Sequence, residues 1–184
     1  VIRVGGAMGL VPLLRERGVD VEALFEQAGL PLSAFEHPDH VIPFAKLCRV
    51  AGLAAERTGF ADVGLRACRS ARVGSLGPVG YLVANSDSVG AGLMCLQTYL
   101  HLHDEGAVIF LQVEDGIAFL GYEVLEPGLE GAEQVAFGAM AIAVVAGSAS
   151  RWRSASASRA PVPSSTAGAS APAAATSRPR ASTT

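Results

Sequence analysis

The sequence lacks any run of about 20 consecutive apolar residues, the length that a helix needs to span a bilayer. The nearest candidate, residues 135–149, is shorter and rich in Ala and Gly. The first residues, Val1–Gly6, contain neither a Met nor the apolar core of a signal peptide. We therefore expect no membrane span, and we interpret the sequence as a fragment or as one read from an internal start.

Cysteine is also scarce, since the chain contains only Cys48, Cys68 and Cys95. An odd number of widely spaced cysteines does not form a disulfide framework, and a reducing cytoplasm fits this pattern. Each cysteine lies in a predicted helix among apolar residues. We therefore interpret all three as small buried hydrophobic residues rather than nucleophiles.

Catalytic motifs are absent from the sequence. It contains no Gly-x-Ser-x-Gly elbow, Walker loop or His-Glu-x-x-His pair, and its glycines do not match the dinucleotide fingerprint. His37 and His40 lie in a predicted loop, and His101 and His103 at a predicted helix end, where the helix dipole favours a cation. Because no Cys pair has ligand spacing, we interpret these histidines as surface residues. We expect no enzyme activity, no metal and no cofactor.

Acidic residues are absent after Glu133, although the chain as a whole has a net charge of −3. Residues 1–147 carry nine basic and 17 acidic groups, a balance of −8, which makes them a poor partner for DNA. Residues 148–184 carry five arginines without an acid and consist mainly of Ala, Ser, Arg, Pro and Thr. We expect this tail to be disordered. One hypothesis is that it is translated from a shifted reading frame, and the alternative is a natural flexible tail.

Apolar spacing and capping residues predict a chain of short helices before and after one β-hairpin. Asp20, Asp62 and Ser88 are the expected amino-terminal caps, and Gly77-Pro78 is expected to open another helix. The predicted helices are Met8–Arg17, Val21–Ala28, a short turn near Phe35, 43–58, Val63–Ser70, Val79–Asn85, Val89–His103 and Glu130–Gly147.

The hairpin prediction depends on Asp115-Gly116, which separates two strand-like runs, 107–113 and 117–124. An Asp-Gly pair favours a type I′ turn, in which both central residues have positive φ. The turn fixes the register and divides the side chains between two faces. The first face, expected in the core, carries Ala107, Ile109, Leu111, Val113, Ala118, Leu120, Tyr122 and Val124. The second face is mixed, and we expect its apolar centre, Val108, Phe110 and Phe119, to be covered by a partner or by further structure.

Several short motifs occur in an order that resembles one protein family. They are Val41-Ile-Pro43 before a helix, Ala54–Gly59, Gly64–Arg66, Gly74-Ser-Leu-Gly-Pro-Val-Gly-Tyr81, Ala84–Ser86, Tyr99, the hairpin and Glu126–Gly128. From about Gly9 to Gly147, or to Trp152, the chain resembles the amino-terminal, arabinose-binding-domain-like region of AraC-type transcription regulators. The similar branch is that of ornithine-utilisation and virulence regulators.

The resemblance implies a cytoplasmic regulator whose amino-terminal domain senses a small effector or mediates self-association. In such regulators a carboxy-terminal pair of helix-turn-helix motifs binds DNA. Residues 148–184 have neither the length nor the periodicity of such motifs, so we expect this polypeptide to lack the DNA-binding part. The alternative is a stand-alone interaction or dimerisation module without a small-molecule ligand.

We therefore predict an α+β, mostly helical fold, with several short helices around a small antiparallel sheet that contains the hairpin. Residues 1–147 are the expected sensing or dimerisation domain, and a homodimer is the expected assembly. The effector is unknown, and its candidate ligands are the polar-tipped residues nearest the hairpin in sequence, Tyr81, Gln97, Tyr99 and His103. The alternative for the tyrosines is a core position with the hydroxyl at its edge.

Overall fold

The computed structural model describes residues 1–149, with side chains described to residue 144. Its helices are α1 (Leu10–Glu16), α2 (Val21–Ala28), α3 (Phe44–Thr58), α4 (Val63–Cys68), α5 (Pro78–Ala84), α6 (Val89–Tyr99) and α7 (Ala132–Ala149). Short 3-10 turns are η1 (Val4–Ala7), η2 (Leu32–Phe35), η3 (Val73–Leu76) and η4 (Leu100–Leu102). The strands are β1 (Ile2–Arg3), β2 (Val41–Ile42), β3 (Ala107–Glu114) and β4 (Ile117–Val124).

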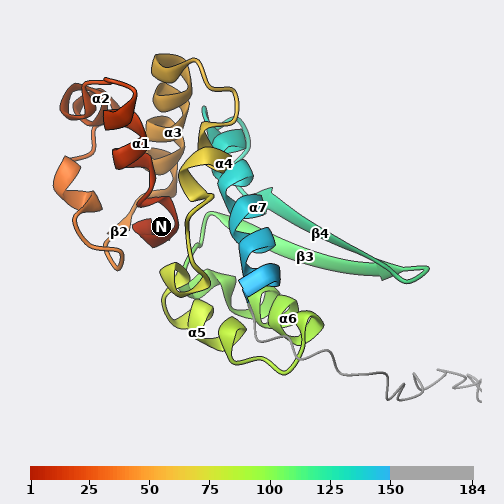
Figure 1. Ribbon diagram of the computed structural model, residues 1–184. Coiled ribbons are helices and arrows are strands. Elements are labelled where there is room, and N and C mark those ends of the chain that lie inside the picture. Colours follow the sequence, from red (N-terminus) through yellow and green to blue (C-terminus); the bar gives the residue numbers. More distant parts are fainter. Residues whose placement is uncertain (150–184) are drawn as a thin grey trace, which may run out of the picture. The chain divides into compact units, whose positions relative to one another are not determined.

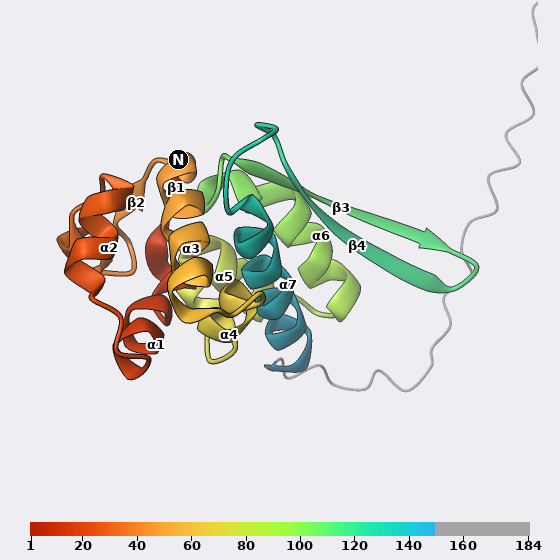
Figure 2. The same cartoon turned by 90° about the horizontal axis from the view of Figure 1, so that it is seen from above.

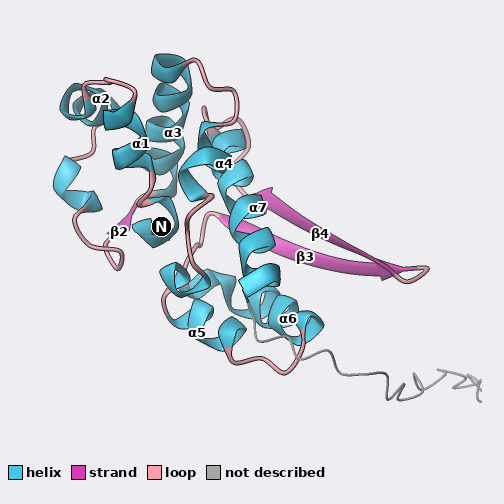
Figure 3. Ribbon diagram, viewed as in Figure 1, coloured by secondary structure: helices cyan, strands magenta, loops and turns pink. Residues whose placement is uncertain are grey.

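The predicted α+β, mostly helical fold class is confirmed, and Figure 3 shows how helices dominate it. Two small antiparallel sheets occur in residues 1–149, one from β1 and β2 and one from β3 and β4. The predicted disordered tail lies outside the described residues from position 150 onward. Residues 148 and 149, which we assigned to that tail, belong to α7.

Two of the three predicted amino-terminal caps are confirmed by side-chain hydrogen bonds. The Asp20 carboxylate accepts a hydrogen bond from the Ala23 amide at 2.9 Å, and the Ser88 hydroxyl accepts one from the Ala91 amide at 3.1 Å. The predicted cap at Asp62 is wrong. Its carboxylate accepts from Nε of Arg66 at 2.7 Å, one helical turn later, and this ion pair replaces the capping bond.

The helices enclose two clusters of buried apolar side chains. The first core cluster lies between β1 and α4 in sequence and includes Phe25, Leu14 and Val50. The second core cluster consists of Cys68, Leu76, Val79, Val83, Leu96, Leu100, Ile109 and Ile142. Helix α7 contacts both clusters, since Val135 packs against the first and Ile142 belongs to the second. It therefore joins the two halves of the core (Figure 1).

The contact between α7 and α4 depends on a glycine. Figures 1 and 2 show the two helices side by side, and their backbones meet at Gly64. A Cβ atom at Gly64 would overlap the carbonyl oxygen of Gln134 in α7. Backbone atoms cannot yield as the tip of a flexible side chain can, so this position requires glycine.

The β1–β2 sheet was not predicted, and it ties the amino terminus to distant segments. Ile2 pairs with Ile42 and also forms an isolated bridge with Asp104. The Arg3 amide donates to the His103 carbonyl at 2.8 Å. These pairings hold the segment after η4 against the amino terminus.

The hairpin has the predicted turn and register. Asp115 and Gly116 both have positive φ, 51° and 80°, and Glu114 pairs with Ile117 as the two-residue loop requires. The expected core face is buried only near the base of the hairpin, at Ala107 and Ile109, whereas Val113 near the tip is 67 % exposed. Figure 2 shows the reason, because the two strands extend beyond α6 and α7.

The expected cover over the second face is not found among the described residues. Val108, Phe110 and Phe119 are 42 %, 48 % and 51 % exposed. Within residues 1–149, β3 and β4 pair only with each other. Local contacts support the two-stranded ribbon instead: the Phe110 ring lies over Gly121 of the opposite strand, and the Gln97 side chain accepts a hydrogen bond from the Leu111 amide at 3.2 Å.

The close approach at Gly64 yields the first prediction. Gly64→Ala should lower the free energy of unfolding by about 3 kcal/mol, because the added methyl group separates α4 from α7. Urea unfolding followed by circular dichroism measures the change. Gly74→Ala is the matched control, since no atom lies within 4 Å of a Cβ added there. Equal stability of the two variants would contradict the packing described for α4 and α7.

Candidate functional site

A cavity of about 80 Å³ lies between the two core clusters. Its walls are mainly aliphatic, and small residues of η1 and α7 leave the space that larger side chains would fill. The aliphatic side chains include Ile2, Leu47, Leu76, Leu100, Ile109 and Ile142. The small residues are Gly6, Ala7, Gly138, Ala139 and Ala143. The base of the hairpin, through Ile109 and Tyr122, closes one side.

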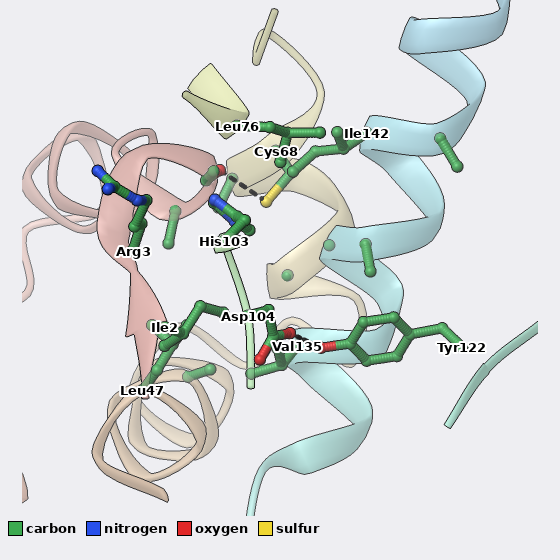
Figure 4. A pocket seen from close by; sticks show the side chains of 18 of the residues that line it. Ile2, Arg3, Leu47, Cys68, Leu76, His103, Asp104, Tyr122, Val135 and Ile142 are labelled. Atoms are coloured by element: carbon green, nitrogen blue, oxygen red, sulfur yellow. Dashed lines mark hydrogen bonds between the residues drawn. The ribbon is translucent and has the colours of Figure 1, made fainter. Parts of the chain in front are cut away.

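Asp104 is the most deeply buried charged residue of this cavity, with 2 % of its surface exposed. One carboxylate oxygen accepts from the Tyr122 hydroxyl at 2.6 Å, and the other accepts from the Gly106 amide at 2.8 Å. Burial raises the pKa of Asp104, and these two hydrogen bonds oppose the rise. Burial and the neighbouring Asp104 also raise the pKa of Tyr122 far above its ordinary value. The hydrogen bond between Tyr122 and Asp104 links the hairpin to the segment that follows η4 (Figure 4).

His103 lines the same cavity and is only 7 % exposed. Its Nδ1 is buried and has no hydrogen-bond partner among the described residues. Burial, with a smaller contribution from the positive charge of Arg3, lowers the pKa of His103 from 6.5 to about 4. The ring is therefore neutral at pH 7 and keeps an unused polar atom inside an apolar space.

The other polar side chains around the cavity already have partners. Gln134 accepts from the Gly64 amide at 3.2 Å and donates to the Ala61 carbonyl at 2.9 Å. The Cys68 thiol donates to the Gly6 carbonyl at 3.2 Å, and burial raises its pKa to about 12, so it stays protonated. Arg3 donates to the Leu102 carbonyl and to Asp39. In Figure 4, Arg3 and Tyr122 lie on opposite sides of His103 and Asp104.

The structure brings one of the four predicted ligand residues to this cavity. Tyr81 on α5 is 70 % exposed and Tyr99 at the end of α6 is 40 % exposed, so neither occupies the core position that we considered as the alternative. Gln97 is bound to the edge of β3 through the Leu111 amide. Only His103 lines the cavity.

The interpretation of His103 as a surface histidine is wrong, because α6 gives way to η4 after Tyr99 and turns this residue inward. His37, His40 and His101 are exposed as expected. The burial of Cys48 and Cys68 is confirmed, whereas Cys95 is only partly buried.

Sequence reasoning missed Asp104, Tyr122 and Gln134. A usable signal existed for Tyr122, since the predicted register already put it on the core face of the hairpin, where a hydroxyl needs a partner. Asp104 gives no such signal, because its burial follows from pairing with Ile2, about 100 residues away in sequence.

The described residues contain no group of three or more His, Cys, Asp or Glu side chains arranged to hold a metal ion. None of their helices has the length and apolar character needed to cross a membrane.

Comparison with known proteins identifies the family. A profile described as the arabinose-binding domain of AraC transcription regulators, N-terminal, matches residues 18–177. The chain therefore belongs to this family of amino-terminal domains of transcription regulators, which is not a family of enzymes, as the sequence predicted. The matched range includes every helix from α2 to α7 and the hairpin, and it continues into the predicted tail.

Among curated proteins, the chain is similar to the HTH-type transcriptional regulator VirS of Mycobacterium tuberculosis. The identity is 28 % over 131 residues in strain CDC 1551 / Oshkosh and also in strain ATCC 25618 / H37Rv. The aligned region covers 70 % of this chain but 38 % of the length of VirS. The likeness is therefore to one part of a longer transcriptional regulator.

The low pKa of His103 predicts how stability depends on pH. Above about pH 6.5 the His103 ring is neutral in both the folded and the unfolded protein. Between pH 6.5 and about 4, only the unfolded protein binds a proton at this ring. The free energy of unfolding therefore falls as pH falls through this range. From pH 7 to pH 5, the wild-type protein should lose about 2 kcal/mol more than His103→Gln. The raised pKa of Asp104 acts in the opposite direction, because it makes the free energy of unfolding rise as pH falls. This effect is present in both the wild type and His103→Gln, so it cancels in the difference between them.

Urea unfolding at a series of pH values tests this difference. His101→Gln, a change at an exposed neighbour, should keep the wild-type pH profile. Parallel profiles for the wild type and His103→Gln would contradict the buried, neutral state of His103.

Proposed function

We propose that residues 1–147 are the effector-sensing domain of an AraC-type transcription regulator and that the effector binds in the cavity between the two core clusters. The observation that carries the proposal is the mainly aliphatic cavity between the two core clusters, which the buried His103 and Asp104 also line. Binding pockets are typically apolar with a few convergent polar groups. The family, which is one of sensor domains, supports the same reading.

DNA binding, in this proposal, belongs to another part of the regulator. The relatives named above are helix-turn-helix regulators, of which this chain matches about two fifths. The charge balance of −8 over residues 1–147 opposes contact with DNA phosphates. A regulator of this type acts in the cytoplasm, where the DNA lies.

Self-association is a second candidate function, and the exposed centre of the second hairpin face favours it. Val108, Phe110 and Phe119 form an apolar patch with Gln112, Glu114 and Glu123 around it. An apolar centre with a polar border is typical of a protein interface. The outer edge of β4 also has no paired strand among the described residues, and such edges favour pairing with another chain. We propose a homodimer formed through this hairpin.

Filling the cavity tests the sensing function. Ala139→Leu places a larger side chain in the cavity, so it should raise the melting temperature by about 3 °C and abolish ligand-induced stabilisation. The measurement is a thermal-shift screen of the full chain against amino acids, sugars, alcohols and carboxylic acids. Ala136→Leu, on the same helix but outside the cavity lining, should respond to ligands as the wild type does. Ligand responses that survive Ala139→Leu would place the effector elsewhere.

A charge in the exposed patch tests self-association. Phe119→Glu should shift the protein toward the monomer in sedimentation velocity while its helical circular dichroism is unchanged, because half of this side chain is already exposed. Tyr81→Glu is the matched control, an equally polar change at an exposed aromatic residue on α5. Leu120→Glu, on the opposite face, should destabilise the domain, because it puts a charge on a partly buried side chain that packs against the second core cluster. Identical sedimentation of Phe119→Glu and the wild type would rule out this interface.

A further inference from the structure

We propose that the effector places a small hydrocarbon group in this cavity and that no polar or charged atom of the effector enters it. This inference rests on the proposed sensing function and names the chemistry that the cavity selects. Two observations carry it. Small residues of α7 line the space, and the polar side chains around it are already engaged within the protein.

Helix α7 keeps the cavity open by presenting small residues to it. Gly138, Ala139 and Ala143 line the space, whereas the large apolar side chain of Phe137, on the same helix, is 41 % exposed. Close packing of the core would favour the reverse arrangement, since protein interiors contain few voids larger than a water molecule. A hydrocarbon group that enters the space supplies the apolar contacts that these small residues leave unmade.

The polar side chains of the lining offer little to a ligand, because they are hydrogen-bonded within the protein. Both carboxylate oxygens of Asp104 accept hydrogen bonds, and the Gln134 amide is bound through its oxygen and through its nitrogen. The Cys68 thiol donates to a carbonyl oxygen. Nδ1 of His103 is unpaired, but it has almost no accessible surface, so a ligand in the cavity cannot reach it.

Polar groups are therefore disfavoured inside the cavity. A buried water molecule needs two to four polar partners, and the aliphatic walls do not supply them. A ketone or hydroxyl group would enter without a partner, which typically weakens binding by about 10-fold or more. The same argument applies to each hydroxyl group of a sugar, although the family's description refers to arabinose.

Charged groups are disfavoured more strongly, because aliphatic walls cannot replace the water that an ion loses on entry. The Arg3 guanidinium is engaged by Asp39 at 2.9 Å and by the Leu102 carbonyl at 3.2 Å, so it does not offer a free partner for an anion. The Asp104 carboxylate is likewise occupied by two donors, so it gives a cation little in return.

The size of the cavity limits the group that enters. The volume of about 80 Å³ is roughly half of the 150 Å³ cavity that binds benzene in a well-studied engineered protein. A compact hydrocarbon group of about three or four carbon atoms matches this space. A probe of that size binds weakly by itself, with a Kd of about 1 mM.

Nuclear magnetic resonance of isoleucine methyl groups tests the inference on the full chain. Ile2, Ile109 and Ile142 line the cavity. Ile42, which is buried outside the lining, and Ile117, which is exposed near the hairpin tip, serve as internal controls. The methyl-labelled protein is titrated with isobutene, acetone, acetate and acetamidinium. These probes share one planar, branched shape and the same number of heavy atoms, and they differ in polarity and charge.

We expect isobutene to shift the δ1 methyl signals of Ile2, Ile109 and Ile142 in a saturable manner and to leave those of Ile42 and Ile117 unchanged. Acetone should bind at least about 10-fold more weakly, because its carbonyl oxygen finds no donor in the cavity. Acetate and acetamidinium should cause no saturable shift at the three cavity methyl groups.

Two variants locate the isobutene site. Ala139→Leu fills the cavity and should weaken isobutene binding by at least about 10-fold. Ala136→Leu, on the same helix but outside the lining, should bind isobutene as the wild type does. If Ala139→Leu fails to fold, Ala143→Leu replaces it, since Ala143 also lines the cavity. Unchanged isobutene binding in a folded cavity-filling variant would overturn the inference.

The failure of this inference is distinguishable from the failure of the sensing function. Acetone, acetate or acetamidinium binding at the cavity methyl groups, with equal or higher affinity than isobutene, overturns the ligand class but leaves the cavity as the sensing site. Absence of any saturable shift with all four probes also overturns the ligand class. The sensing function itself fails only if Ala139→Leu leaves the ligand responses of the thermal-shift screen unchanged.

Discussion

The pairing of the amino terminus with residues 103 and 104 is the constraint on which the rest of this structure depends. The Ile2–Asp104 bridge and the hydrogen bond from the Arg3 amide to the His103 carbonyl fix a short segment between the two core clusters. This segment holds a carboxylate and an imidazole where the surroundings are aliphatic. The carboxylate is tolerated because Tyr122 and Gly106 donate to it, whereas the imidazole is tolerated only as the neutral form. The hairpin is oriented by the same group, since Tyr122 is one of its strand residues.

Local sequence signals predicted the local structure well. Asp115-Gly116 fixed the turn, the register and the division of side chains between faces, because a two-residue loop leaves one pairing pattern. Asp20 and Ser88 capped their helices as expected, yet Asp62 did not, because Arg66 one turn later competes for the same carboxylate. Capping preference is a weak free energy of about 1 kcal/mol, so one ion pair is enough to replace it.

The site was much less predictable, since it is assembled by contacts that are distant in sequence. The position of His103 at a helix end predicted exposure, and it is buried because β1 pairs with the segment beside it. Tyr81, Gln97 and Tyr99 lie near the hairpin in sequence but face solvent or the edge of β3. Nearness in sequence to a strand says nothing about which side of the neighbouring helix points at the core, and here α6 buries Leu96 rather than the polar residues beside it.

The two proposed functions use opposite faces of the hairpin. Because side chains alternate along a strand, neighbouring residues of the same strand belong to the two faces in turn. Ile109 and Tyr122 form part of the cavity wall, and their neighbours in sequence, Val108, Phe110 and Glu123, belong to the exposed face. The ladder from Ala107–Val124 to Glu114–Ile117 joins the two strands by backbone pairing along their whole length. A ligand that displaces Tyr122 or Ile109 therefore also displaces the exposed face. By linkage, a ligand that binds the associated form more tightly than the monomer also favours association by the same factor.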